Sequence, residues 1–285
     1  MNENLRILTW NVLYRDVDAR LPLLVPRVEA IRPDVFLVQE TTAAHARALA
    51  SATGMHLVAE GERTHPTAPT INAILAAEPP MRAASHTIDA GARCTYLTAD
   101  WQVGSTLLRV GTTHLRHTHQ AGRMGVDSGY RAVARGADAA AIASDSIRES
   151  VSMRLAQLAE IRRLREQDAV DAEVLTGDLN FVPDGAEYGE IVSWGLNDAW
   201  RAAPRLGSGA TIVERNDLIG DGRGVYRDLR DGTMPGAGGD LDYTLDYQFS
   251  RGAIDVGHAW IVGDVDPGES FPSDHLGIVV EYRID

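Results

Sequence analysis

Many short segments with the composition of β-strands follow one another along this chain, often with no helix between them. Each is rich in Val, Ile, Leu, Thr or Tyr, the residues that favour strands. Strands are predicted at Leu5–Trp10, Val35–Gln39, Met55–Ala59, Ile71–Ala76, Cys94–Trp101, Thr106–Thr113, Glu173–Gly177, Tyr243–Phe249, Val256–Val262 and Leu276–Tyr282. A doubly wound sheet needs a helix after almost every strand, so this order instead favours mixed sheets covered by outer helices.

A few longer segments have the spacing of helices. They are Leu21–Ile31, Thr42–Ala52 and Asp145–Gln167, and Gly54 follows the second where a C-terminal cap is expected. The longest repeats apolar residues every three or four positions, at Ile147, Val151, Leu155, Leu158, Ile161 and Leu164. Such a stripe predicts a helix that covers a sheet with one face.

The chain is predicted to form one domain over residues 1–285. Its 285 residues are 44% hydrophobic and 24% charged, which suits a sizeable core, and no linker divides them. The segments 116–144 and 205–240 are too long for routine connectors and are predicted to be functional or mobile loops. The single cysteine, Cys94, excludes an internal disulfide framework and a cysteine-rich zinc site.

The chain is strongly acidic, with 27 Lys and Arg against 40 Asp and Glu and a formal net charge of −13. This balance argues against a surface that binds nucleic acid phosphates or anionic lipids over its whole area. The sequence begins Met1-Asn2-Glu3-Asn4, without a basic segment before an apolar run, and no apolar stretch is long enough to span a bilayer. We therefore expect a cytoplasmic protein with no membrane partner.

Polar side chains gather where the predicted strands end or begin. They are Asn11, Glu40, His114, Asp178, Asn180, Asp246, Asp274 and His275. Taken singly, each of these residues could cap a turn or lie in the core with its hydrogen bonds made. A sheet, however, brings residues at strand ends together at one crevice, which is the usual place for a site. Grouped carboxylates destabilise a fold when they are buried without partners, and a divalent cation with a bound phosphate would remove that penalty. Oxygen ligands favour Mg²⁺, with Mn²⁺ as the alternative.

The order of these motifs resembles that of the endonuclease/exonuclease/phosphatase family. The matching motifs are Thr9-Trp10-Asn11, Gln39-Glu40, Thr113-His114-Leu115, Arg154-x-x-Gln157, Gly177-Asp178-x-Asn180, Leu245-Asp246-Tyr247 and Ser273-Asp274-His275. The similarity runs from residue 5 to residue 282, and the shared order is far more specific than any one motif. The resemblance implies a deoxyribonuclease-I-like fold of the α+β class, a four-layer α/β/β/α sandwich with two mixed β-sheets packed face to face.

The resemblance also implies how a metal and a water molecule would be held. Glu40 would be the main Mg²⁺ ligand, assisted by Asn11 and, through water, by Asp274. Asp178 would orient or deprotonate the attacking water. This is coherent with phosphoryl transfer, which needs a water in line with the leaving group and positive charge on the phosphoryl oxygens.

Further residues would, by the same resemblance, bind the phosphoryl group. Asn180 and His114 would bind its oxygens, and His275 would act as a base or as an electrostatic stabiliser. Asp246 would hold the tautomer of His275, as a carboxylate orients a catalytic imidazole.

Arg154 and Gln157 share one helix face, and a structural tie between helix and sheet explains them at least as well as a catalytic role. Arg116 and His117 open a basic segment that continues through His119, Arg123, Arg131 and Arg135. This segment is either a lid that meets a substrate phosphate or a solvated loop. Asn216 lies where relatives carry a loop beside the substrate, although Ile212 replaces the tryptophan of that loop.

Two readings from other classes are weaker. His117-x-His119 suggests the zinc motif of the metallo-β-lactamase fold, but that motif requires Asp and His where this chain has Ala121 and Gly122. A catalytically inactive module that binds a phosphate ligand on the same fold would be expected to lose at least one site residue. All of Glu40, Asp178, Asn180, Asp274 and His275 are present.

The favoured activity is therefore hydrolysis of a phosphoester, by a phosphatase or a phosphodiesterase, with Mg²⁺ as cofactor. Net acidity and two long loops favour a small phosphorylated molecule or nucleotide as substrate. A nuclease acting on DNA or RNA is the alternative. Nucleic acid is the less favoured partner because no run of Lys and Arg interleaved with aromatic residues forms a polymer-binding surface.

Overall fold

The structure is a computed structural model that describes residues 3–63, 68–117, 139–213, 215–219 and 242–284. The strands are β1 (Asn4–Asn11), β2 (Val35–Thr41), β3 (His56–Glu60), β4 (Ile71–Ala76), β5 (Arg82–Ile88), β6 (Cys94–Val103), β7 (Thr106–His114), β8 (Ala172–Asp178), β9 (Asn197–Asp198), β10 (Arg205–Leu206), β11 (Asp246–Gly252), β12 (Ile254–Val262) and β13 (Gly277–Ile284). The helices are α1 (Val17–Ile31), α2 (Ala43–Thr53), α4 (Ala139–Arg165), α5 (Ala186–Ser193) and α6 (Ala199–Ala202), with a 3₁₀ turn at Asp217–Ile219. Within these ranges, no helix is long and apolar enough to cross a membrane.

The strands form two mixed β-sheets. The first sheet has seven strands in the order β10-β12-β13-β1-β2-β4-β3, and the second has six in the order β5-β6-β7-β8-β11-β9. β1 runs parallel to β2, and β7 runs parallel to β8. β13 is antiparallel to β1, and β11 is antiparallel to β8. The carboxyl ends of β1, β2, β7 and β8 can therefore lie near the amino ends of β11 and β13.

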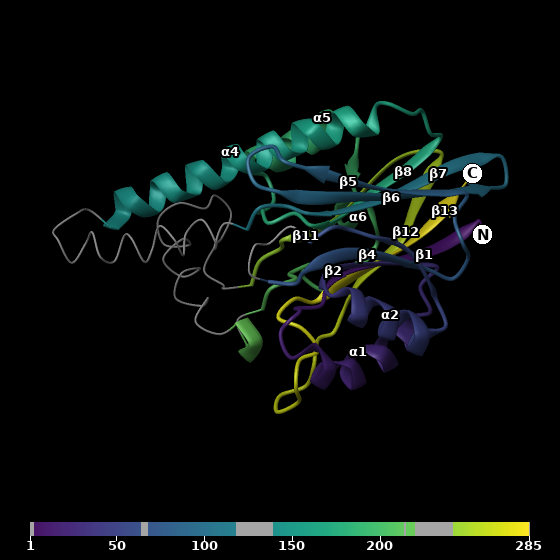
Figure 1. The fold of residues 1–285 in the computed structure, drawn as a ribbon, viewed down its shortest axis with the longest axis horizontal. Helices are drawn as coiled ribbons and strands as arrows, with labels where there is room; N and C mark the ends of the chain where they lie inside the picture. The colour runs from purple at the N-terminus through teal and green to yellow at the C-terminus, as the bar shows by residue number, and fades with distance from the viewer. Residues whose placement is uncertain (1–2, 64–67, 118–138, 214, 220–241, 285) are drawn as a thin grey trace.

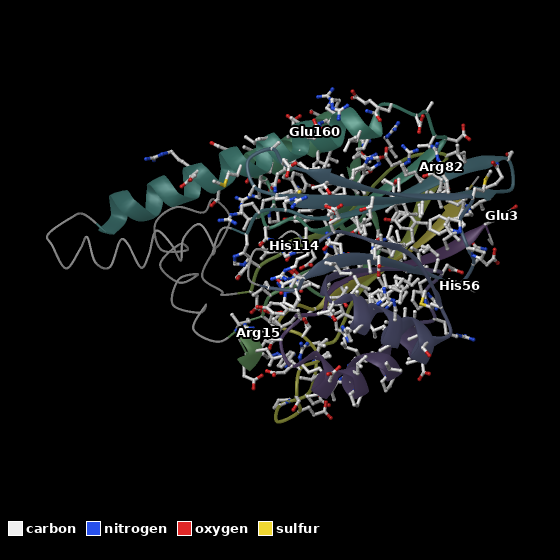
Figure 2. The ribbon with its side chains drawn as sticks, viewed as in Figure 1. Glu3, Arg15, His56, Arg82, His114 and Glu160 are labelled. Atoms are coloured by element: carbon white, nitrogen blue, oxygen red, sulfur yellow. The ribbon has the colours of Figure 1, made fainter. Side chains whose placement is uncertain are left out.

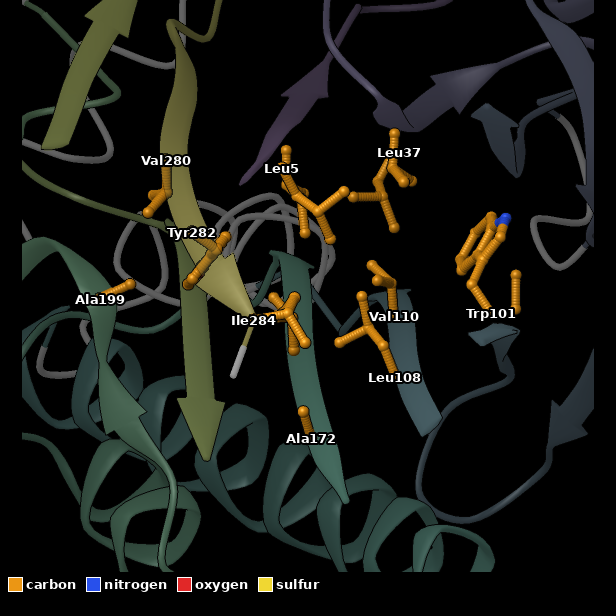
Figure 3. Packing of buried hydrophobic residues seen from close by; sticks show 14 of the residues in the cluster. Leu5, Leu37, Trp101, Leu108, Val110, Ala172, Ala199, Val280, Tyr282 and Ile284 are labelled. Carbon is orange, nitrogen blue, oxygen red and sulfur yellow. The ribbon is translucent and has the colours of Figure 1, made fainter. Parts of the chain in front are cut away.

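The two sheets pack face to face and carry helices on their outer faces. Figure 1 shows α4 and α5 above the second sheet and α1 and α2 below the first. A cluster that includes Leu5, Leu37, Leu108, Val110 and Val280 fills the space between the sheets (Figure 3). Separate apolar clusters join each sheet to its own helices. This is the expected four-layer α/β/β/α sandwich, and the prediction of the fold is confirmed.

A buried polar layer joins the two sheets within this apolar interior. It consists of Thr9 and Gln39 in the first sheet and Thr112 and Thr176 in the second, all with no exposed surface. Gln39 Nε2 donates to Thr9 Oγ1 at 3.1 Å and, across the sheets, to Thr112 Oγ1 at 3.0 Å. Thr176 Oγ1 donates across the sheets to Thr9 Oγ1 at 3.3 Å. These directional bonds fix the two sheets relative to one another at this level.

The structure departs from the sequence predictions at some elements. β5 and α5 were not predicted, since β5 contains Arg, Ser and His in place of a β-branched run. α1 begins at Val17, four residues before the predicted start, and continues through Pro22 and Pro26. α4 begins at Ala139, so the last part of the segment predicted as a loop over 116–144 is helical.

Strand directions place the candidate site at one end of the sandwich. Asn11 ends β1, His114 ends β7 and Asp178 ends β8, whereas Asp246 begins β11. Figure 2 shows His114 and Arg15 at this end, with Glu3 and Arg82 at the opposite end. The polar layer lies directly below, because Thr9, Thr112 and Thr176 each precede one of these strand-end residues by two positions.

Candidate active site

Strand register brings three of the predicted residues side by side, and a hydrogen bond across the sheets adds a fourth. In the second sheet, His114 pairs with Asp178 and Asp246 pairs with Asp178 from the other side. In the first sheet, Asn11 pairs with Gln39, the residue before Glu40. Asn11 then reaches across the sheets, where its Nδ2 donates to Asp178 Oδ2 at 2.9 Å. Both sheets therefore contribute to one group of side chains.

Asp178 lies at the centre of this group and has no exposed surface. Its Oδ1 accepts the backbone N–H of Asn180 at 3.2 Å, and its Oδ2 lies 3.4 Å from His114 Nε2. Burial raises the pKa of Asp178 above the ordinary value for a carboxyl, while His275, His114 and the Asn11 hydrogen bond oppose that rise. A buried carboxylate with a raised pKa is a stronger base than an exposed one.

His275 and Asp246 form a buried dyad beside Asp178. His275 Nδ1 lies 2.8 Å from Asp246 Oδ2, and its Nε2 lies 3.7 Å from Asp178 Oδ2. Burial alone lowers the pKa of His275, but the carboxylates of Asp246 and Asp178 outweigh burial and raise that pKa well above its ordinary value. The imidazole therefore sits between two carboxylates in its charged form.

Glu40 is half-buried and has an unusual backbone conformation, with φ 49° in the left-handed region. Burial raises the pKa of its carboxyl; Asp274 and Asp178 add to the rise, while His114 and His275 oppose it. No side chain in the described ranges donates a hydrogen bond to Glu40. Among the described residues, like charges thus meet at a carboxylate that accepts no side-chain hydrogen bond, an arrangement that a bound cation stabilises.

The side chains present fit a divalent cation. The charged groups close to Glu40 include the carboxylates of Asp274 and Asp178 beside the imidazoles of His114 and His275. Carboxylate oxygens are ligands that Mg²⁺ and Mn²⁺ prefer. A second grouping consists of Asp178, Asp246 and His275, whose candidate ligand atoms lie within 4.8 Å of one another. One oxygen of this grouping, Asp246 Oδ1, is buried without a hydrogen bond to the described residues.

Three supporting residues were not identified as functional from the sequence. Trp10 Nε1 donates to the backbone oxygen of His275 at 2.9 Å. The Thr211 hydroxyl lies 3.4 Å from the backbone N–H of Asp246 and accepts from it, and the Thr211 carbonyl accepts from Leu276 N at 2.7 Å. Ser273 Oγ donates to the backbone oxygen of Asn11 at 2.6 Å. These bonds fix the backbone that carries the dyad. The available signals were the places of Trp10 and Ser273 inside the motifs Thr9-Trp10-Asn11 and Ser273-Asp274-His275.

Two predicted polar residues contact the backbone of neighbouring loops. Asn180 has φ 54° and donates from Nδ2 to the Leu115 oxygen at 3.2 Å. Asn216 has no exposed surface, and its Nδ2 donates to the Ser273 oxygen at 2.8 Å. The structure thus places Asn216 behind the loop that carries His275, and a substrate-binding role for it stays a prediction.

Arg154 and Gln157 tie α4 to the segment after β7. Gln157 Oε1 accepts the backbone N–H of Arg116 at 3.0 Å, and one Arg154 nitrogen donates to the Arg116 oxygen at 3.1 Å. Arg154 also pairs with Glu187 at 2.8 Å. Both residues are buried, in keeping with the structural tie. Arg116 and His117 end a described range, whereas His119, Arg123, Arg131 and Arg135 lie outside the described residues.

His45 lies in α2, immediately behind the Glu40 loop, and is 2% exposed. Its Nδ1 lies 3.1 Å from Thr41 Oγ1, and its Nε2 is buried without a hydrogen bond to the described residues. Burial, together with the positive charge of Arg20, lowers the pKa of His45 to about 4. His45 is therefore neutral in the folded protein at neutral pH.

We expect His45 to make the folded state less stable as pH falls. The unfolded residue takes up a proton near pH 6.5 and the folded one only near pH 4, so the unfolded state binds more protons between these values. Between pH 7 and pH 5 this contribution lowers the free energy of unfolding by about 2 kcal/mol. In urea unfolding, His45→Gln should lack this loss of unfolding free energy between pH 7 and pH 5. His56→Gln, at an exposed strand position, should retain it. Equal pH slopes for wild type and His45→Gln would contradict the assignment.

Solved structures resemble this fold over nearly its whole length. A conserved protein of unknown function from Enterococcus faecalis V583 is 18% identical with a TM-score of 0.68, covering 98% of this chain and 100% of that one. Mannosyl-6-phosphatase from Bacteroides thetaiotaomicron is 15% identical with a TM-score of 0.65, covering 98% and 99%. Humanized TDP2 from D. rerio is 18% identical with a TM-score of 0.63, again covering 98% and 99%.

No match was found among curated proteins. The family model described as "Endonuclease/Exonuclease/phosphatase family" matches residues 8–275. These residues extend from the interior of β1 to His275 and so include every motif at the site end of the sandwich. The resemblance seen in the sequence is confirmed, and the chain belongs to the endonuclease/exonuclease/phosphatase family.

Proposed function

We propose that this protein is a Mg²⁺-dependent phosphoester hydrolase whose preferred substrate is a small phosphorylated molecule. The observation that carries the proposal is the buried series Asp246–His275–Asp178, with contacts of 2.8 Å and 3.7 Å, beside the carboxylate of Glu40. Such a series provides both a base for water and a fixed positive charge for a phosphoryl group. Family membership supports a hydrolase of this general kind.

Glu40 would hold the metal ion together with Asn11 and, through water, Asp274. A bound Mg²⁺ supplies charge that neutralises the phosphoryl oxygens and polarises the phosphorus centre. The side-chain oxygen of Asn11 accepts the backbone N–H of Leu13 at 3.1 Å and keeps a second lone pair. Asp274 Oδ1 lies 3.3 Å from the hydroxyl oxygen of its neighbour Ser273.

Asp178 would orient the attacking water and take its proton. The water oxygen forms a bond to phosphorus, and the ester P–O bond on the opposite side breaks. Because burial raises the pKa of Asp178, its carboxylate accepts a proton more readily than an exposed aspartate. The hydrogen bond from Asn11 Nδ2 holds Asp178 Oδ2 in place and thereby fixes the orientation of the whole carboxylate.

His275 would face the phosphoryl group as an imidazolium. Asp246 accepts from Nδ1, which leaves the proton on Nε2 for the phosphoryl oxygens. His114 and Asn180, at the ends of neighbouring strands, would bind the remaining oxygens. Arg116 and His117 follow His114 and Leu115 in the chain and are proposed to meet the more distant part of the substrate.

The preference for a small substrate rests on charge and on one structural relative. A net charge of −13 disfavours approach of a long polyanion. Mannosyl-6-phosphatase has a similar fold, and its name supports a phosphorylated substrate of that size for this chain. DNA or RNA remains the alternative substrate class.

A panel of phosphoesters tests the proposal directly. Phosphate release would be measured from sugar phosphates, nucleotides and p-nitrophenyl phosphate. Diester cleavage would be measured with bis-p-nitrophenyl phosphate, a plasmid and an oligonucleotide, each with Mg²⁺, with Mn²⁺ and with EDTA. We expect metal-dependent release from at least one small ester. Cleavage of nucleic acid without release from small esters would favour the nuclease alternative. No turnover of any ester, together with phosphate binding, would favour an inactive binding module.

Glu40→Gln is expected to weaken Mn²⁺ binding by about tenfold to hundredfold, equivalent to about 1.4–2.8 kcal/mol. The substitution removes one ligand charge and keeps the side-chain size. Calorimetric titration with Mn²⁺ measures the effect, with circular dichroism to check the fold. Glu62→Gln, at an exposed carboxylate paired with Arg93, is the matched control and should leave the affinity unchanged. Full turnover of the wild type in EDTA would contradict the metal assignment.

A further inference from the structure

A single arginine lies beneath the loops that carry the candidate site. Arg20 belongs to α1 and shares the buried face of that helix with Leu24, Val28 and Ile31. Its side chain is 6% exposed. An arginine is among the residues least often buried on an apolar helix face, so its contacts must compensate the loss of hydration.

Among the described residues, the Arg20 guanidinium donates only to backbone carbonyls. One terminal nitrogen donates to the oxygens of Val12 and Pro272, each at 2.7 Å. The other donates to the oxygens of Leu13 and Arg15. The acceptors belong to two segments far apart in sequence: the loop after β1 and the loop before β13. The planar fork of one guanidinium therefore joins both loops.

These two loops carry candidate site residues at their ends. Asn11 ends β1 and adjoins Val12, and its side-chain oxygen accepts the backbone N–H of Leu13. Pro272 directly precedes Ser273, whose hydroxyl donates to the backbone oxygen of Asn11. Arg20 thus closes a ring of contacts that links Asn11 to the Ser273-Asp274-His275 segment.

The loop after β1 has a conformation that needs outside support. Leu13 and Asp16 have φ 50° and 51°, in the left-handed region that costs an ordinary residue about 1–2 kcal/mol. Asp16 makes no side-chain capping bond to α1. The oxygens of Val12, Leu13 and Arg15 point instead to Arg20, so the guanidinium stabilises this otherwise strained turn.

The charge of Arg20 also lies where a helix does not favour it. Arg20 is near the amino end of α1, where the helix dipole favours anions. Burial lowers its pKa, whereas the carboxylates of Asp274 and Glu40 are close enough to raise it. The cation therefore sits below the acidic part of the site and offsets some of its negative charge.

We propose that Arg20 is a positioning residue that holds the loop after β1 and the loop before β13 at a fixed separation. The separation of Asn11 from Asp274 and His275 then follows from one buried side chain. The catalytic consequence rests on the proposed function, but the coupling of the two loops does not. Arg20 touches neither substrate nor metal and acts through the backbone that it holds.

Hydrogen exchange tests the loop coupling without any substrate. The reporters are the hydrogen-bonded amides of Leu13 and His275, one in each loop. In Arg20→Met both should exchange at least about tenfold faster, because the two loops lose their common partner. Arg20→Lys keeps the positive charge but loses the planar guanidinium with its several donors. It should give an intermediate acceleration of exchange in both loops.

Arg165 provides the matched control. It is also a buried arginine, 3% exposed, but it pairs with Glu173 at 2.6 Å near the opposite end of β8. Arg165→Met should lower the melting temperature and leave exchange at Leu13 and His275 unchanged. Acceleration in only one loop of Arg20→Met, or equal acceleration in Arg165→Met, would overturn the proposal. If Arg20→Met does not fold, Arg20→Lys and Arg165→Lys are compared in the same way.

Kinetics and metal binding then test the consequence for the site. Arg20→Lys should weaken Mn²⁺ binding and lower kcat more than it changes KM, since it displaces the groups that act on phosphorus. Accelerated exchange with unchanged kcat and Mn²⁺ affinity would overturn the positioning role in the site. Absence of turnover and Mn²⁺ binding in the wild type would refute the proposed function, and the exchange result would still decide the loop coupling.

Discussion

Asp178→Asn is expected to lower phosphoester turnover by about 10³-fold while the chain stays folded. The carboxylate is proposed to take the proton of the attacking water, and an amide cannot accept it. The substitution changes the side-chain volume very little at a position without exposed surface. Turnover would be measured with the best ester found in the panel, at saturating Mg²⁺.

The same substitution should leave thermal stability equal to or above that of the wild type. Because burial raises the folded-state pKa of Asp178, ionisation of this carboxyl disfavours folding, and its contribution to stability is lost as pH rises through that raised pKa. At pH 7 an uncharged amide avoids this penalty. Removal of the charge should also lower the pKa of His275, which Asp178 helps to raise. Thermal melts and NMR titration of the His275 ring measure both effects.

Asp171→Asn is the matched control. Asp171 lies just before the opposite end of the same strand, where its carboxylate accepts the backbone N–H of Leu107 at 2.8 Å. Its substitution should leave turnover unchanged. Unimpaired turnover in Asp178→Asn would contradict the proposed base, and a loss of cooperative melting would show that the residue is required for folding.

Gly177→Ala is expected to destabilise the protein by at least about 3 kcal/mol. Gly177 has φ 135°, which side chains rarely adopt, and a Cβ atom there would lie 1.9 Å from the backbone oxygen of Thr113 on β7. β7 and β8 pair in parallel at this point, so the strands must separate to admit a methyl group. That movement displaces Asp178, the next residue. Urea unfolding would measure the loss.

Gly189→Ala separates this effect from the general effect of replacing a glycine. Gly189 lies within α5, and a Cβ atom there would have no neighbour within 4 Å. Alanine should therefore raise stability by about 0.5–1 kcal/mol. If Gly177→Ala changes the free energy of unfolding no more than Gly189→Ala does, then β7 and β8 accommodate the methyl group without separating.

The grouping of the candidate site residues at one end of the sandwich could be predicted because it depends on strand direction. Asn11, His114 and Asp178 end strands, and parallel neighbours bring strand ends to one edge. The short apolar runs located those strands in the sequence with small errors at their ends. β5 escaped prediction because its polar composition suits an edge strand and has no distinguishing period.

The supporting contacts could not be predicted because they join residues distant in the chain. Asn216 was expected to bind substrate, yet its side-chain amide donates to Ser273, 57 positions away. Arg20 left a usable signal, since it continues the apolar spacing of Leu24, Val28 and Ile31. An arginine in an apolar stripe indicates a buried partner but does not identify it. The early start of α1 has the same cause, because its first turn is stabilised by loops and not by a side-chain cap.

The polar layer formed by Thr9, Gln39, Thr112 and Thr176 affects how this scaffold can acquire new specificities. Apolar side chains between two sheets can be substituted with small shifts of one sheet against the other. Hydrogen bonds between the sheets are directional, so this set of bonds forms at one relative position of the sheets. Segments above the layer can therefore be lengthened, shortened or transplanted from relatives while the candidate site residues keep their spacing. Successful transplants should be those whose two junctions both fall between His114 and Ala172, or both between Asp178 and Asp246, because these leave Thr112 and Thr176 in place.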